Sequence, residues 1–171
     1  MAEEQRDEEG EQVLAKSIRT GQVVYLAIGA AIIAYVVVGY LIASANDPFK
    51  GFVKLPPQVC TILRCVLWAM AVVGVLPLAM LLRRVVCRPE TIRSTVRTVA
   101  DFGALFLRQS ILTAAVSEMP AIWGLILFLL AGSWVDLVGL CCLGSAYLAI
   151  MFPTASKAAA LAEHMARGSK E

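Results

Sequence analysis

Four long runs of apolar residues dominate the chain, and each is bounded by polar or turn-forming residues. A helix needs roughly 20 mostly apolar residues to cross the hydrocarbon core of a bilayer. The runs at about 23–45, 59–82, 110–131 and 134–152 meet that length. They are continuous, without the alternating polarity of membrane β-strands. The pattern therefore predicts an all-α, four-helix transmembrane bundle.

The composition supports a membrane protein. Apolar residues make up 59% of the 171 residues and charged residues only 16%, whereas about a quarter of the residues in a soluble domain are charged. A soluble domain of this length cannot bury so much apolar surface, but a bilayer covers it. The chain also starts acidic, unlike a secretory signal, so we expect the first apolar run to be a retained anchor.

Basic residues predict the orientation, because connections rich in Lys and Arg stay in the cytoplasm. The connection between the second and third runs is rich in arginine: Arg83, Arg84, Arg88, Arg93, Arg97 and Arg108. The first loop offers only Lys50 and Lys54. With four crossings, both termini are expected on the cytoplasmic side (N-in, C-in) of a bacterial inner membrane.

The pattern divides the chain into three parts. Residues 1–20 form an acidic tail that we expect to be disordered, because few apolar residues are available to fold it. Residues 21–153 form the membrane domain with its four spans. Residues 154–171 form a cytoplasmic C-terminal tail.

A segment before the third span has its own helical pattern. Pro89 and Glu90 suit the start of a helix, and apolar residues then recur at helical spacing between 91 and 107. We expect a cytoplasmic amphipathic helix here, with Gly103 as a possible bend. Its arginines and their neighbours are expected to contact anionic lipid headgroups: Arg83, Arg84, Arg88, Arg93 and Arg97. The alternative is a partner module that uses the same arginines at the membrane surface.

Small residues recur on three helix faces at spacings that let helices approach closely in lipid. They are Ala30 and Ala34; Thr113, Ser117 and Ala121; and Cys141, Ser145 and Ala149. We expect them to pack the bundle. They would also allow a homo-oligomer or a larger membrane complex.

One charged side chain, Glu118, interrupts the third run. It follows Arg108 by about ten residues, so at 1.5 Å per residue it lies roughly 15 Å deep, near the bilayer centre. An ionised acid is costly at that depth, so we expect a protonated carboxyl that can donate a hydrogen bond. The alternative is a purely structural strut between helices.

Two prolines suggest where such a carboxyl would donate its proton. Pro120 frees the carbonyl of Val116, and Pro77 frees that of Val73, because proline has no N–H. Arg64 lies about five residues into the second run, and we expect it to extend outward to the interface. The alternative is that Arg64 turns inward and pairs with a carboxylate.

The residues around Glu118 resemble a known family. Ala114-Ala115-Val116-Ser117-Glu118-Met119-Pro120-Ala121-Ile122-Trp123-Gly124-Leu125-Ile126 is similar to the carboxylate-bearing helix of the c (proteolipid) subunits of rotary ATP synthases. In that family, small residues lead to Glu or Asp, and Ala, Ile, an aromatic residue, Gly and Leu follow. The resemblance implies that Glu118 binds a proton. The residues expected to support it are Ala114, Ser117, Pro120, Ala121 and Gly124. The chain as a whole resembles small bacterial four-span membrane proteins.

Two functions remain open at this point. The first is a c-subunit-like proton-binding carboxylate that acts in proton translocation or in association with ATP synthase. The second is a non-catalytic membrane scaffold or accessory subunit. No enzyme activity is expected, because nucleotide-binding, hydrolase and metalloprotease motifs are missing. Five cysteines without a CxxC pair, and a single histidine, predict no metal or cofactor. No nucleic-acid partner is expected.

Overall fold

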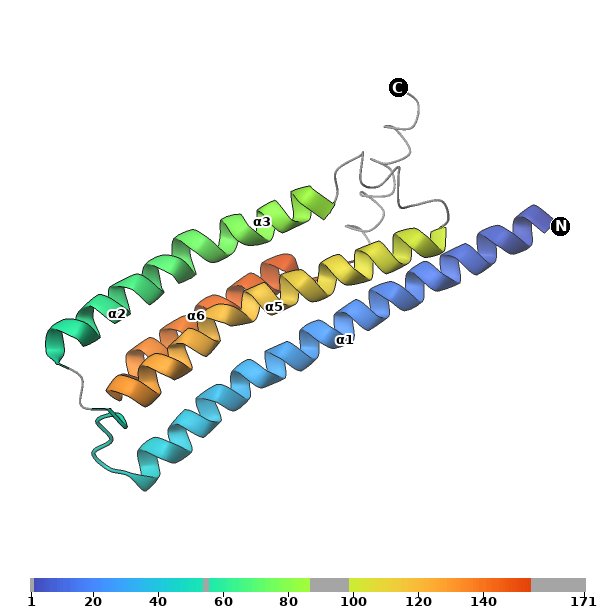
Figure 1. Cartoon of the computed structure of the whole chain (residues 1–171). Coiled ribbons are helices and arrows are strands. Elements are labelled where there is room, and N and C mark those ends of the chain that lie inside the picture. The colour runs from blue at the N-terminus through green and yellow to red at the C-terminus, as the bar shows by residue number, and fades with distance from the viewer. Residues whose placement is uncertain (1, 54–55, 87–98, 155–171) are drawn as a thin grey trace.

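The computed structural model describes residues 2–53, 56–86 and 99–154 of the chain. Within these residues the regular elements are helices, and no strand occurs. In chain order they are α1 (Ala2–Ala45), α2 (Pro57–Ala69), the π-helix η1 (Met70–Gly74), α3 (Val75–Val86), α5 (Val99–Ala131) and α6 (Trp134–Met151). α2, η1 and α3 follow one another end to end as a single rod (Figure 1).

Among the described residues, four helical stretches are long and apolar enough to cross a membrane. They are Gln12–Ala45, Pro57–Leu81, Gly103–Ala131 and Trp134–Met151. The prediction of an all-α protein with four candidate spans is therefore confirmed.

α5 occupies the centre of the bundle. It contacts α1 on one side, α6 on another, and the α2–η1–α3 rod on a third (Figure 1). α1 also contacts α6, so these two helices and α5 form a three-helix unit. The rod packs mainly on α5 through α3. A side chain on α5 can therefore meet any other span.

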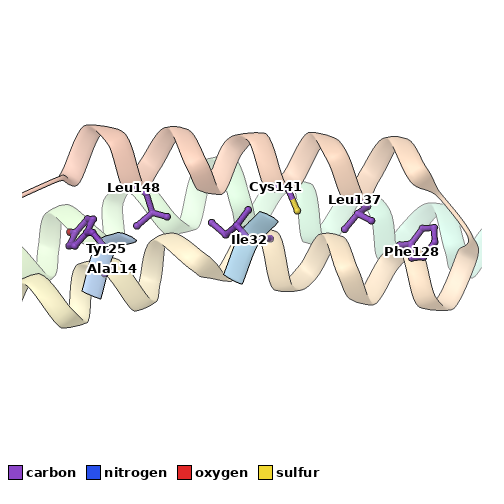
Figure 2. Close-up of a cluster of buried hydrophobic side chains, with 8 residues drawn as sticks. Tyr25, Ile32, Ala114, Phe128, Leu137, Cys141 and Leu148 are labelled. Atoms are coloured by element: carbon purple, nitrogen blue, oxygen red, sulfur yellow. The ribbon is translucent and has the colours of Figure 1, made fainter. Parts of the chain in front are cut away.

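Buried side chains fill the contact among α1, α5 and α6 along its length (Figure 2). Tyr25, Ala114 and Leu148 meet toward one end, and Leu137 and Phe128 toward the other. α5 and α6 run antiparallel, so each layer of this core takes residues from opposite ends of the two helices. The core therefore continues through the depth of the membrane.

The π-helix η1 brings the rod against α5 and α6. Ala71 is fully buried and packs with Leu127 of α5 and Leu140 of α6. The N–H of Val75 donates to the carbonyl of Met70, five residues back, which is the π pattern. Pro77 follows closely and has no N–H, so the preceding turn cannot keep the α-helical pairing throughout. The π turn is the local adjustment to that proline.

The loop after α1 packs on the turn between α5 and α6. The N–H of Phe52 donates to the carbonyl of Leu129 at 2.8 Å. The ring of Phe49 lies against that of Phe128, with centroids 5.0 Å apart. Gly132 turns the chain with a φ of 69°, which suits glycine because it has no Cβ. Both connections therefore lie at the same end of the bundle.

The start of the first span and the end of the fourth meet at the opposite end. Nε2 of Gln22 donates to the carbonyl of Pro153 at 3.1 Å. The rings of Tyr25 and Phe152 make an edge-to-face contact with centroids 5.7 Å apart. The start of the first candidate span and the end of the fourth therefore lie at the same end of the bundle.

The first helix begins earlier than the sequence analysis expects. That analysis assigns residues 1–20 to a disordered tail, whereas α1 begins at Ala2. Glu, Gln, Ala, Leu and Arg predominate there, and all are strong helix formers. Acidic residues at a helix N-terminus also interact favourably with the helix dipole. Low hydrophobicity and high helix propensity therefore lead to different expectations for this segment.

Gly103 has a different role from the expected bend. It lies inside the continuous helix α5, and a Cβ at Gly103 would come within 2.8 Å of Oγ of Ser17 on α1. The glycine therefore permits close approach of the two helices near the start of their candidate spans. Residues 91–98 of the expected amphipathic helix lie outside the described residues.

The arginines expected at the membrane surface fall largely outside the description. Arg83 and Arg84 belong to α3, but their side chains are not described. Arg88, Arg93 and Arg97 lie outside the described residues altogether. Their contact with lipid headgroups stays a prediction.

Candidate functional site

The carboxyl of Glu118 has a partner on another helix. Tyr35 of α1 donates a hydrogen bond from its hydroxyl to Oε1 of Glu118 on α5, at 2.5 Å. Both side chains are half-buried. Glu118 lies near the middle of the candidate span Gly103–Ala131. The acid is therefore held at mid-membrane by a polar group of the neighbouring span.

The position of Tyr35 follows from the buried face of α1. Ile32 precedes it by three residues and Gly39 follows it by four, and both are buried. Residues at these spacings share one face of a helix. That face packs on α5 and α6, so the Tyr35 ring reaches into the bundle instead of toward lipid. Sequence reasoning did not name Tyr35.

All five residues expected to support Glu118 are buried: Ala114, Ser117, Pro120, Ala121 and Gly124. Their observed role is to hold helices close together. A Cβ on Gly144 of α6 would lie 3.1 Å from the carbonyl oxygen of Ser117 and 3.6 Å from Cβ of Ala121. A Cβ on Gly124 would lie 3.0 Å from Cβ of Leu140. At least three of the five therefore form the close contact between α5 and α6.

The partner of Glu118 also differs from the expected one. The carbonyls of Val116 and Val73 are the acceptors expected for its proton. The structure gives the carboxyl a donor instead, the hydroxyl of Tyr35. A hydroxyl both donates and accepts, so it can serve a carboxyl in either protonation state, whereas a carbonyl can only accept.

Hydroxyl groups line α5 between Glu118 and the end of the bundle where α1 and α6 meet. Ser110, Thr113 and Ser117 are buried and lie about one turn apart. Thr113 also lies 2.8 Å from the hydroxyl of Tyr25 on α1. Ser117 donates to the carbonyl of Thr113 at 2.8 Å. A stripe of polar atoms therefore leads along α5 toward the carboxyl.

A second polar cluster joins α2 to α6. Nε of Arg64 donates to Oδ2 of Asp136 at 2.7 Å, and the indole N–H of Trp68 donates to Oδ1 at 3.0 Å. Nη2 of Arg64 also donates to Oγ of Ser133 at 3.0 Å. The Asp136 side chain is 7% exposed and that of Arg64 is 45% exposed. The alternative for Arg64, a pairing with a carboxylate, is therefore the one observed, while its Nη2 also reaches Ser133 in the turn between α5 and α6.

Sequence reasoning named Arg64 but missed Asp136, although a signal was present. Arg64 is the only charged residue in the predicted span 59–82, and Asp136 is the only one in 134–152. A charge inside a span is costly unless it is paired, so two lone opposite charges indicate an ion pair. Both oxygens of Asp136 have donors, whereas Glu118 is bonded to a neutral hydroxyl. The two acids therefore suit different roles.

The rod is also tied to α6 through its π turn. The buried hydroxyl of Tyr147 donates to the carbonyl of Ala71 in η1 at 3.0 Å. A π turn disturbs the regular backbone pairing, so a nearby side-chain donor can satisfy a carbonyl there. This contact stabilises the irregular turn against α6.

Among the described residues, no three His, Cys, Asp or Glu side chains converge as a metal site would require. The candidate site therefore consists of the Tyr35–Glu118 pair and the hydroxyl stripe.

No family model, curated protein or solved structure matches this chain. The function of the site is therefore inferred from its own geometry.

Proposed function

We propose that this protein is a small multi-pass membrane protein in which Glu118 binds and releases a proton at mid-membrane. It would act in proton translocation or in association with a rotary ATP synthase. The observation that carries the proposal is the 2.5 Å hydrogen bond from Tyr35 to Glu118, deep within two candidate spans. Ionisable residues at this depth are rare and usually functional.

The chemistry of the pair fits a reversible proton site. A neutral carboxyl and a carboxylate both accept a hydrogen bond from a tyrosine hydroxyl. The bond between Tyr35 and Glu118 can therefore persist when the proton leaves. An arginine beside the acid, as at Asp136, would instead keep it permanently paired. Glu118 can exchange its proton without a rearrangement of helices.

The hydroxyl stripe supports a route for that proton along α5. Ser110, Thr113 and Ser117 are spaced along α5 from Glu118 toward the end where α1 and α6 meet. Hydroxyls donate and accept in turn, and so can relay protons with water. Protons would reach Glu118 from the membrane face that contains the start of the first span and the end of the fourth.

Orientation and family form part of the same proposal. The connection between the second and third spans is rich in arginine, which supports a cytoplasmic position for that face in a bacterial inner membrane, with its arginines at anionic headgroups. The residues 114–126 resemble the carboxylate helix of ATP synthase c subunits, which supports a proton as the species bound.

A second function is favoured by a different observation. Polar contacts join several pairs of helices: Tyr35–Glu118, Tyr25–Thr113, Arg64–Asp136 and Tyr147–Ala71. In a non-catalytic scaffold or accessory subunit, the Glu118 bond would be one more tie of this kind. Its carboxyl would then stay protonated and closed to exchange.

Carbodiimide labelling of the full chain in detergent, measured across pH, separates these functions. Carbodiimides react with accessible protonated carboxyls. We expect labelling at Glu118 that fades as pH rises, that Glu118→Gln abolishes, and that Asp136→Asn leaves unchanged. If Glu118 stays unlabelled at every pH while Glu118→Gln unfolds at the parent's temperature, the carboxyl is a strut and the proton-binding proposal fails.

A further inference from the structure

A lateral groove of about 410 Å³ lies between α1 and α6. Its walls include Leu26, Gly29 and Ala30 from α1, and Ser145, Leu148 and Ala149 from α6. Both helices are candidate membrane spans, so the groove opens sideways toward hydrocarbon. Its volume falls in the range of roughly 300–1,000 Å³ that is usual for ligand sites.

The groove exists because small residues face each other without closing the gap. Ala30, Ser145 and Ala149 are exposed, and a Cβ added to Gly29 would meet no atom within 4 Å. Small residues between membrane helices usually permit close contact. Here α1 and α6 stay apart, so apolar walls remain uncovered. In a bilayer such walls gain dispersion energy only if another apolar group fills the space.

The residues at the two ends of the groove indicate its position along the membrane normal. Tyr25 and Phe152 lie at one end, where their rings make an edge-to-face contact. Just beyond them, Gln22 is bonded to the carbonyl of Pro153. The groove therefore starts beneath the membrane face where α1 and α6 meet, and extends to Ile33, about 12 Å deeper at 1.5 Å per residue. This is the depth of acyl chains in one leaflet.

Two basic residues precede the part of α1 that lines the groove, and Arg19 lies close to the groove side of the helix. Arg19 precedes Leu26 by seven residues, which is close to two helical turns. Lys16 lies one turn further toward the N-terminus, and both side chains are exposed. Arg19 is thus about 10 Å above Leu26, at the level of lipid headgroups. A negatively charged phosphate complements these cations.

We propose that the α1–α6 groove binds an acyl chain of an anionic phospholipid, whose phosphate pairs with Arg19 and Lys16. The apolar walls select a hydrocarbon chain, and the basic residues select a negative headgroup. The residues that form this site are different from the Tyr35–Glu118 pair and from the arginines of the connection between the second and third spans. A second copy of the protein is the competing occupant.

The acyl-chain part is tested on the full wild-type chain in vesicles that contain phosphatidylglycerol with a photoreactive acyl chain. Cross-linked peptides are mapped by mass spectrometry. We expect several-fold more labelling at residues 25–33 and 145–152 than at the comparably exposed Ile62 and Val66 of α2. Even labelling of all lipid-facing residues, or protection of the groove together with protein–protein cross-links, overturns the proposal.

A matched pair of variants tests the groove itself. Gly29→Leu places a side chain in the space and should reduce the enriched labelling to the level of α2. Gly74→Leu is the control, because a Cβ there also meets no atom within 4 Å but lies on η1. Unchanged labelling in Gly29→Leu contradicts the proposal.

The headgroup part is tested by comparing photoreactive phosphatidylglycerol with the corresponding phosphatidylcholine. The wild type should label the groove more strongly with the anionic probe. Removing both charges with Lys16→Gln and Arg19→Gln should erase that preference while labelling by phosphatidylcholine persists. Equal labelling by the two probes in the wild type contradicts anionic selectivity.

Discussion

The hydroxyl of Tyr35 on α1 donates a 2.5 Å hydrogen bond to Oε1 of Glu118 on α5. The two residues are 83 positions apart in the sequence. Water cannot replace a lost partner easily in the hydrocarbon region, so each group depends on the other. The same bond therefore sets the environment of the acid and holds the first span against the third.

Tyr35→Phe should lower the stability of the bundle. The substitution keeps the ring and removes the donor, and hydrogen bonds between membrane helices typically contribute about 0.5–2 kcal/mol. Unfolding in a denaturing detergent measures the effect. Tyr40→Phe is the control, because Tyr40 is 61% exposed and makes an edge-on contact with Trp134. Equal stability of the two variants would show that the Tyr35 bond contributes nothing.

Substituting Arg64 should lower the stability of the protein more than substituting its partner Asp136. Arg64→Gln leaves a carboxylate that is 7% exposed without its cation, whereas Asp136→Asn leaves an arginine that is 45% exposed. We expect a loss of about 1–3 kcal/mol for Arg64→Gln and less for Asp136→Asn, since the long side chain of an unpaired Arg64 can extend to the membrane interface.

The double variant provides the internal check on this pair. Combining Arg64→Gln with Asp136→Asn should cost less than the sum of the single changes, because residues in contact are coupled. Arg108→Gln controls for loss of an exposed arginine. Additive single effects would contradict a direct ion pair between α2 and α6.

Tyr147→Phe should loosen the π turn of the second span. The variant removes the donor to the carbonyl of Ala71 and leaves the ring in place. Amide hydrogen exchange should become faster over residues 70–75, because less energy then holds η1 against α6. Exchange over 134–140 should change little. Unaltered exchange at η1 would mean that the backbone of the turn keeps its hydrogen bonds without a contribution from Tyr147.

Glycines at helix contacts should tolerate substitution by leucine less well than glycines that face lipid. Gly144→Leu places atoms against the backbone of α5, since even a Cβ lies 3.1 Å from the Ser117 carbonyl oxygen. Overpacking of this kind typically costs about 1–3 kcal/mol. Gly74→Leu meets open space and should be neutral or stabilising by up to about 1 kcal/mol. Thermal unfolding in detergent compares them, and a neutral Gly144→Leu would contradict the close α5–α6 contact.

The membrane helices could be predicted because their signal is local. A helix in hydrocarbon satisfies its own backbone and must be apolar along its length, whatever its neighbours are. The predicted span 134–152 accordingly corresponds to α6 at Trp134–Met151, and the predicted end of the first span at 45 matches Ala45. The structure assigns a helix from Ala2 where disorder was expected, and hydrophobicity does not report the helix propensity of Glu, Gln and Ala.

The polar partners could not be predicted in the same way. The partner of Glu118 depends on which helices are neighbours and on how each helix is rotated about its axis. The apolar runs determine neither of these. No pattern in the sequence therefore indicated Tyr35, although it shares the buried face of Ile32. The sequence did contain a signal for Arg64 and Asp136, because they are lone opposite charges in two predicted spans.

Infrared spectroscopy of the full chain in lipid vesicles tests the central claim most directly, by following the carbonyl band of the Glu118 carboxyl across pH and after transfer to D₂O. The account predicts a band of a protonated carboxyl that Glu118→Gln removes and Asp136→Asn leaves. That band should shift in D₂O and disappear reversibly as pH rises. A band that neither shifts in D₂O nor changes with pH would show a carboxyl closed to exchange. That result would contradict proton binding and favour the scaffold.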